Sequence, residues 1–153
     1  MGLEIERRFL VASRDWPAAE AVCAIRQAYF GSDSQVAVRI RCCDGRYILT
    51  LKSALAPGVR REFEVDVPQA TGEEMFRHLT ARPPIEKQRH LVRDSGRLWE
   101  IDVFGGDNEG MVIAEVELPA IDAPLTLPAW VGREVTHDSR FSNNALYRHP
   151  FRC

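Results

Sequence analysis

Hydrophobic and polar residues alternate along most of this 153-residue chain. A period of two is typical of β-strands with one buried face. Turn signals rich in Gly, Pro and Asp separate the alternating segments, and Asp44-Gly45 suits a two-residue type I′ hairpin. The pattern predicts eight strands, at residues 3–11, 24–31, 35–43, 46–53, 60–67, 86–93, 97–104 and 111–118.

Helical signals are fewer. Thr71-Gly72-Glu73-Glu74 has the form of a capping box and predicts a helix over 71–81. A second helix is predicted near 139–147, and a short helical piece near 16–23. The chain shows no internal repeat and no dividing linker, so a single domain over 1–153 is expected.

The polar positions of the strands are almost all full charges. Residues two apart share a face of a strand, so Glu4, Glu6 and Arg8 lie opposite Leu3 and Ile5. The fifth, seventh and eighth strands are also acidic on this face, whereas the third, fourth and sixth are basic. A sheet face in contact with water normally carries more neutral polar residues.

Two architectures fit this separation. One is a flat sheet with a charged outer face. The other is an α+β fold, in which an eight-stranded antiparallel β-barrel forms a tunnel with a charged lumen and helices flank its outside. Eight strands suffice to close a barrel, and we favour this second architecture. Buried charges are costly unless they are paired, so the lumen should bind a ligand carrying both signs, such as a polyphosphate with a divalent cation.

Composition narrows the classes of function. The net charge of −2 argues against nucleic-acid binding, and no apolar run approaches the roughly 20 residues of a membrane-spanning helix. The four cysteines, Cys23, Cys42, Cys43 and Cys153, lack zinc-type spacing and are expected to be free thiols. With no signal peptide in the N-terminal residues, we expect a cytoplasmic protein without a membrane partner. A monomer and a homodimer both remain open.

The opening Glu4-Ile5-Glu6-Arg7-Arg8 resembles the Glu-x-Glu-x-Lys signature of the CYTH superfamily, the triphosphate tunnel metalloenzymes. The resemblance implies an eight-stranded tunnel that binds a triphosphate. Compact bacterial members of this length look most like inorganic tripolyphosphatases, which release phosphate and diphosphate. The resemblance to the family continues in order along nearly the whole chain. It includes Arg39-Ile40-Arg41, Leu49-Thr50-Leu51-Lys52, Arg60-Arg61-Glu62-Phe63-Glu64, Ile85-Glu86-Lys87-Gln88-Arg89, Trp99-Glu100-Ile101-Asp102, Ala114-Glu115-Val116-Glu117-Leu118 and Asp138-Ser139-Arg140-Phe141-Ser142-Asn143.

Site residues are implied position by position. The metal ligands, for Mg²⁺ or Mn²⁺, are Glu4, Glu6, Glu115 and Glu117. The acids that orient the bases or assist a second metal are Glu62, Glu64 and Asp102, and Tyr29 matches a lumen tyrosine. The phosphate-binding bases are Arg39, Arg41, Lys52, Arg60, Lys87 and Arg89.

Arg8 departs from the family pattern, which has Lys at this position. Arg keeps its proton, whereas Lys can exchange one. Arg8 can therefore replace the Lys if the Lys supplies only positive charge, but not if it shuttles a proton. Tripolyphosphate hydrolysis is the favoured function. The alternatives are a thiamine triphosphatase, a class IV-type adenylate cyclase, and a polyphosphate- or nucleotide-binding protein without catalysis.

Overall fold

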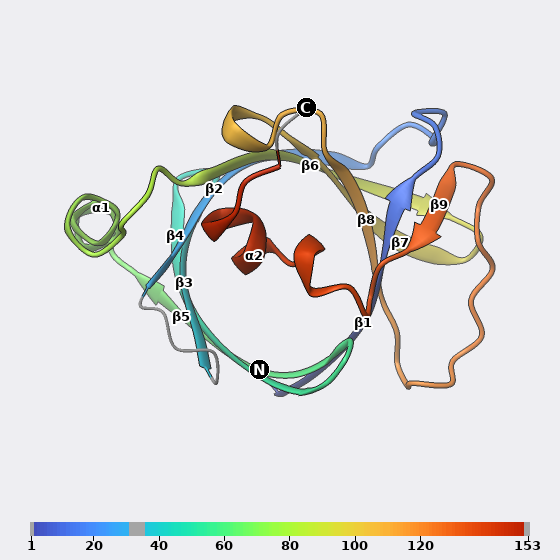
Figure 1. Cartoon of the computed structure of the whole chain (residues 1–153), viewed down its shortest axis with the longest axis horizontal. Helices are drawn as coiled ribbons and strands as arrows, with labels where there is room; N and C mark the ends of the chain where they lie inside the picture. Colours follow the sequence, from blue (N-terminus) through green and yellow to red (C-terminus); the bar gives the residue numbers. More distant parts are fainter. Residues whose placement is uncertain (1, 31–35, 152–153) are drawn as a thin grey trace.

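The strands close into a ring (Figure 1). In the computed structural model, which describes residues 2–30 and 36–151, eight antiparallel strands pair in the order β5-β4-β3-β2-β6-β7-β8-β1, and β1 pairs again with β5. This confirms the closed barrel over the flat sheet. The turn between the predicted strands at 24–31 and 35–43 lies outside the described residues, and so does Cys153. The strands are β1 (Gly2–Val11), β2 (Ala21–Phe30), β3 (Val36–Cys43), β4 (Arg46–Ala56), β5 (Val59–Val67), β6 (Ile85–Asp94), β7 (Arg97–Phe104), β8 (Val112–Glu117) and β9 (Val131–Glu134).

The alternation decides which side chains enter the barrel. On β1 the residues Glu4, Glu6 and Arg8 point inward, while Phe9 packs outside against Trp99 of β7 with ring centroids 5.8 Å apart. Trp130 covers Trp99 in turn, at 5.4 Å. The apolar outer face is therefore buried here by aromatic residues of the loops. Along β1, β4 and β5 part of it stays exposed, including Leu3, Phe63 and Val65.

One predicted element was wrong, and one strand was missed. Residues 16–20 form no helix, and β2 begins at Ala21. Trp16 lies in the loop before β2 and packs on Trp130, with ring centroids 6.2 Å apart. Its burial therefore needs no helix. The strand β9 was not predicted, because its four residues show little alternation; it adds to β1 through the pairs Phe9↔Glu134 and Val11↔Val131.

The helices lie on opposite sides of the barrel wall (Figure 1). The helix α1 (Gln69–His78) lies outside, against β3 and β4. It begins after Pro68, and no side chain caps it, so the predicted capping box starts too late. The predicted C-terminal helix divides into two short ones at Ser142. A 3₁₀ turn, η2 (Ser139–Phe141), precedes α2 (Asn143–Arg148), and a further 3₁₀ turn, η1 (Gly106–Asn108), links β7 to β8.

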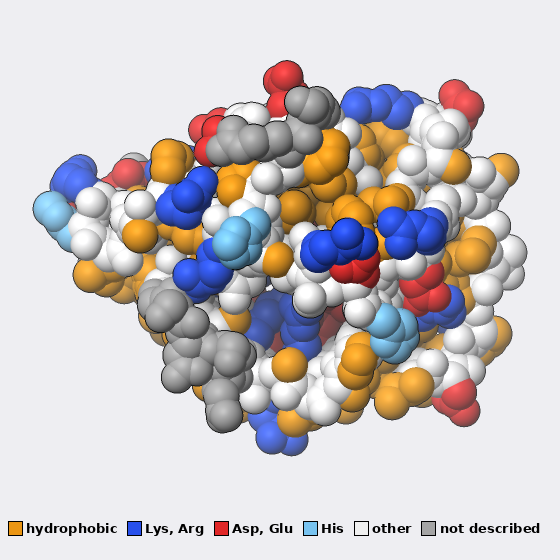
Figure 2. All heavy atoms as spheres, viewed as in Figure 1, with side chains coloured by type: hydrophobic (Ala, Val, Ile, Leu, Met, Phe, Trp, Pro, Cys, Tyr) orange, Lys and Arg blue, Asp and Glu red, His pale blue; other side chains and the backbone are white. Residues whose placement is uncertain are grey.

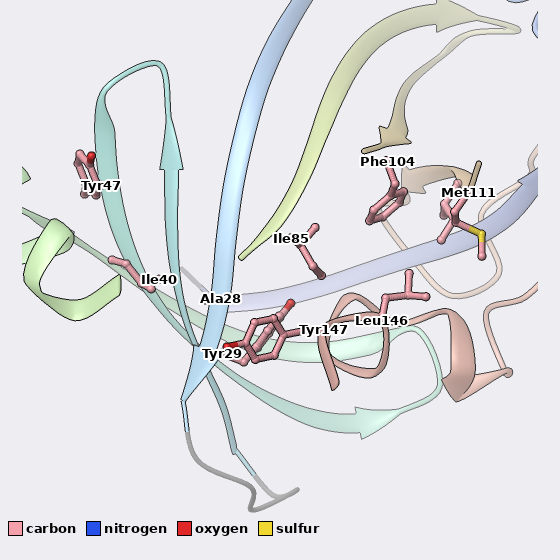
Figure 3. Packing of buried hydrophobic residues seen from close by; sticks show 10 residues of the cluster. Ala28, Tyr29, Ile40, Tyr47, Ile85, Phe104, Met111, Leu146 and Tyr147 are labelled. Atoms are coloured by element: carbon pink, nitrogen blue, oxygen red, sulfur yellow. The ribbon is translucent and has the colours of Figure 1, made fainter. Parts of the chain in front are cut away.

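The helix α2 lies inside the ring and fills one end of the tunnel. Its Leu146 and Tyr147 are buried among Tyr29, Ile85 and Phe104 (Figure 3). We expected the helices to cover the outside only. Apolar positions on α2 fit either side of the wall, so its sequence pattern does not distinguish them. Among the described residues, none of the helices has the length and apolar character needed to cross a membrane.

Replacing Gly72 by Ala should loosen α1. A Cβ atom at this buried glycine would overlap the ring of Tyr47, at Cδ2 and Cγ. Overpacking of this kind costs about 1–3 kcal/mol of unfolding free energy, measurable by urea unfolding. The exposed neighbour Thr71→Ala is the control. An equal loss in Gly72→Ala and in the double variant Gly72→Ala/Tyr47→Ala would contradict the overlap.

Candidate active site

The tunnel encloses a cavity of about 340 Å³. In the view of Figure 2 basic and acidic side chains are visible at the bottom of a central hollow. The antiparallel register places the inward residues of neighbouring strands side by side, as in Glu6↔Glu117, Glu4↔Arg60 and Arg39↔Thr50. Most of the predicted site residues line this cavity, namely Glu4, Glu6, Arg8, Tyr29, Arg39, Arg41, Lys52, Arg60, Glu62, Glu64, Arg89, Glu115 and Glu117.

Carboxylates gather where β1 meets β8. Glu6 and Glu115 are hydrogen-bonded to each other, so one of them carries a proton. Burial, together with the nearby Glu115 and Glu4, raises the pKa of Glu6 to about 8. Burial alone would raise the pKa of Glu115 as well, but Arg8 and Arg89 outweigh it and hold that pKa well below its ordinary value. Without a cation, the proton therefore resides on Glu6.

Arg8 lies between these two carboxylates. Its guanidinium is buried, at 3.4 Å from Glu6 Oε1 and 3.5 Å from Glu115 Oε2. Burial disfavours the charged form, but attraction to Glu115 and Glu6 outweighs it and raises the pKa of Arg8. Its Nε–H has no partner in the described structure. Arg8 is thus a permanent positive charge at the centre of the acidic group.

Basic residues occupy the wall formed by β3, β4 and β5. Lys52 Nζ is balanced by Glu4 at 3.1 Å and by Glu62 at 3.0 Å. Arg39 donates to Thr50 Oγ1 at 3.1 Å and approaches Glu64 only to 3.9 Å, and its buried Nε–H has no partner in the described chain.

Arg41 has no carboxylate within 4.0 Å among the described residues. Its Nε donates instead to the neutral Gln27 Oε1, at 2.8 Å. Burial, with repulsion from Arg39 and Arg89, lowers the pKa of Arg41 to about 10. A buried cation without a counter-charge is unfavourable, so this wall has positive charge available for an anion.

Lys87 and Asp102 lie behind the cavity rather than on its surface. Lys87 Nζ contacts Asp102 Oδ2 at 2.7 Å, and both side chains are almost fully buried. Asp102 also accepts from Arg89, at 2.8 and 2.9 Å. Lys87 donates in addition to Asn143 Oδ1, at 2.9 Å, so α2 stands between Lys87 and the tunnel. Asp102 orients Arg89, whereas Lys87 reaches no open space.

Burial and the neighbouring charges set the pKa values of Asp102 and Lys87. Burial opposes ionisation of Asp102, but Arg89 and Lys87 outweigh it and lower the pKa of Asp102 to about 2. Burial lowers the pKa of Lys87 to about 7, because Asp102 only partly offsets the loss of water and the repulsion from Arg89.

Several neutral residues of the site were not predicted. Asn143 and Asn144 reach the cavity from α2, and Gln27 links Arg41 to Asn143, donating to its Oδ1 at 3.1 Å. Glu100 also lines the cavity and accepts from Arg89 at 3.2 Å. The charge pattern along the strands marks Glu100, but neutral residues carry no such signal. For Asn143 and Asn144 the position of α2 inside the barrel was needed.

Fold and cavity define a class of protein: a closed barrel whose tunnel joins a group of carboxylates to a wall of bases. The CYTH domain model matches residues 2–145, and the chain belongs to the CYTH family. It is 38% identical to an inorganic triphosphatase of Acetivibrio thermocellus over 152 residues, which cover 99% of this chain and 97% of that protein.

Two further comparisons agree. An inorganic triphosphatase of Nitrosomonas europaea is 36% identical over 147 residues, which cover 94% of this chain and 95% of that protein. The crystal structure of an inorganic triphosphatase superposes with a TM-score of 0.70 at 34% identity, covering 94% of this chain and 93% of that one.

Proposed function

We propose that this protein hydrolyses inorganic tripolyphosphate to diphosphate and phosphate with the help of a divalent cation. The observation that carries the proposal is the positive charge of Arg39 and Arg41 opposite the carboxylate group of β1 and β8: among the described residues, Arg41 has no carboxylate within 4.0 Å and Arg39 has only Glu64, at 3.9 Å. A linear polyphosphate supplies negative charge to the basic wall, and the cation bound to it supplies positive charge to the carboxylate group. The names of the relatives support the same reaction.

The carboxylate group fits a hard cation. Its donors are oxygens only, which Mg²⁺ and Mn²⁺ prefer to the sulfur and nitrogen ligands typical of zinc. Burial, together with the nearby Glu115 and Glu4, raises the pKa of Glu6 and keeps a proton on it, and a cation would replace this proton. We propose Mg²⁺ or Mn²⁺ as the cofactor, held by Glu4, Glu6, Glu115 and Glu117. When bound, it offsets charge on the phosphate oxygens and favours attack by water.

The chain's own residues bind and orient the substrate. Arg39, Arg41 and Arg60 face the cavity, and among the described residues only Arg39 has a carboxylate within 4.0 Å, so these guanidinium groups have N–H donors left for phosphate oxygens. Asp102 and Glu100 fix the guanidinium of Arg89. Positioning of the terminal phosphoryl group and stabilisation of its charge are the main requirements of phosphoryl transfer. We infer that Lys87 supports this wall from behind rather than binding phosphate.

The cavity lining favours an inorganic substrate over thiamine triphosphate or a nucleotide. Apart from Tyr29, its apolar side chains are only Ala37 and Ala54 in the described residues. Tyr29 packs on Tyr147 of α2 at 5.8 Å. A base or thiazole ring would need an aromatic or apolar surface on which to stack. The free thiols of Cys23, Cys42 and Cys43 are consistent with a reducing cytoplasm as the place of action.

The test is phosphate release from tripolyphosphate, ATP and thiamine triphosphate, with Mg²⁺, with Mn²⁺ and with EDTA. We expect release only with a divalent cation, and fastest from tripolyphosphate. Faster release from thiamine triphosphate or ATP would change the substrate. Tight tripolyphosphate binding by calorimetry without turnover would indicate a binding protein.

Arg8→Lys tests whether the residue acts by charge alone. Because Arg8 is a fixed charge between Glu6 and Glu115, the Lys variant should keep turnover within about tenfold, whereas Arg8→Met should lose at least about 100-fold. Initial rates of phosphate release measure both. A rate in Arg8→Lys well above that of the natural protein would show that a proton-exchanging Lys improves the reaction, contrary to this assignment.

A further inference from the structure

Two cysteines and an aspartate converge away from the carboxylate group of the tunnel. Cys23 Sγ, Cys43 Sγ and a carboxylate oxygen of Asp44 lie within 4.8 Å of one another. Cys23 comes from the start of β2, Cys43 from the last position of β3, and Asp44 from the hairpin turn that follows. Among the described residues, it is the only set of three His, Cys, Asp or Glu side chains whose ligand atoms all lie within 4.8 Å of one another.

The β2–β3 ladder brings these residues together across twenty positions of sequence. Ile25 pairs with Cys43, so Cys23, two residues before Ile25, lies diagonally from Cys43 on the same face of the sheet. The hairpin turn, with positive φ at Asp44 (52°) and Gly45 (77°), then returns Asp44 beside both thiols. The Asp44 carboxylate lies 4.0 Å from Cys43 Sγ.

The group is accessible, and the cations paired with it in register, Arg46 beside Cys43 and Arg89 beside Cys23, are each bound to other carboxylates. Cys23 and Cys43 are partly buried and Asp44 is exposed, which leaves a route for entry. Arg89 is the strand neighbour of Cys23 on β6, but its guanidinium is already bound to Asp102 and Glu100. Burial, with Cys43 and Asp44 close by, raises the pKa of the Cys23 thiol to about 11. At neutral pH this thiol therefore keeps its proton, which a bound cation would displace.

We propose that Cys23, Cys43 and Asp44 bind a thiophilic divalent cation such as Zn²⁺ or Cd²⁺, with water in the fourth position. Two sulfurs and one carboxylate oxygen form a ligand set that such cations prefer and that Mg²⁺ avoids. Tetrahedral Zn²⁺ with Zn–S bonds of about 2.3 Å needs its sulfurs about 3.8 Å apart. The observed spacing requires at most a small side-chain shift. Binding releases the two thiol protons to solvent.

The experiment is a Cd²⁺ titration of the full chain in a thiol-free reductant, monitored by the ultraviolet absorption of Cd²⁺–thiolate bonds and by calorimetry. This absorption reports sulfur ligation alone, so cations bound to the tunnel carboxylates do not contribute. We expect one thiolate-bound Cd²⁺ per chain. Cys23→Ser and Cys43→Ser should each weaken it at least about 100-fold, and Asp44→Asn at least about tenfold. Asn suits the positive φ at this position.

Cys42→Ser is the matched control. Cys42 is adjacent to Cys43 but points to the other face of β3, toward Tyr47, so its loss should leave the titration unchanged. Absence of the thiolate absorption, or its persistence in both Cys23→Ser and Cys43→Ser, would overturn the proposal. So would its loss in Cys42→Ser. Phosphate release plays no part in this test, which therefore stands independently of the proposed hydrolysis.

Discussion

Glu6→Gln should reduce cation-dependent phosphate release from tripolyphosphate by at least about 100-fold. Glu6 is at the centre of the carboxylate group, hydrogen-bonded to Glu115 and paired in register with Glu117. Gln has nearly the same shape as Glu but carries no negative charge with which to bind a cation. Initial rates at saturating Mg²⁺ or Mn²⁺ measure the loss.

The same substitution should leave the fold intact. The pKa of Glu6, about 8, means that without a cation its side chain is already neutral near pH 7, and Gln imitates this neutral form. Urea unfolding without metal should therefore match that of the natural protein. Glu20→Gln, which alters the exposed ion pair with Arg93, controls for removal of one carboxylate. Undiminished turnover in Glu6→Gln would refute its assignment as a metal ligand.

Asp102→Asn should cost about 3–5 kcal/mol of unfolding free energy at pH 7, because it leaves the buried Lys87 without a carboxylate and removes the nearest carboxylate of Arg89. Lys87, with its pKa near 7, can lose its proton to limit this cost. Urea unfolding measures the effect. Asp66→Asn, at the exposed pair with Arg46, is the control and should change little. A loss no larger than that of Asp66→Asn would contradict the role of the buried pair.

The effect of Asp102 should also depend on pH. Its pKa is about 2 in the folded chain against an ordinary value of 3.8, so the folded state binds fewer protons in this interval. The stability it contributes is present above about pH 4 and is lost as the pH falls toward 2. The difference in unfolding free energy between the natural protein and Asp102→Asn should therefore shrink from pH 4 to pH 2. A constant difference over this interval would show that the Asp102 charge is not its cause.

Much of the barrel and its lining was determined by the sequence. The alternation in β1 places Glu4, Glu6 and Arg8 on one face wherever the strand lies, because the period of a strand is fixed by its backbone geometry. The same holds for Arg39 and Arg41 on β3. Asp44-Gly45 specified its hairpin through local conformational preference alone. Because the polar face of these strands is almost entirely charged, a closed barrel around a charged lumen was favoured over a flat sheet.

Only the tertiary structure decided the rest. The helix α2 could have packed on either side of the wall, and its place inside brings Asn143 in front of Lys87. The strand β9 pairs with β1 at Phe9 and Val11, beyond the stretch that β5 covers, and its four residues do not by themselves favour a strand. Cys23 and Cys43 are twenty residues apart, and their proximity follows from the register of β2 against β3. Contacts between distant segments depend on register and packing of the whole chain, which no local pattern encodes.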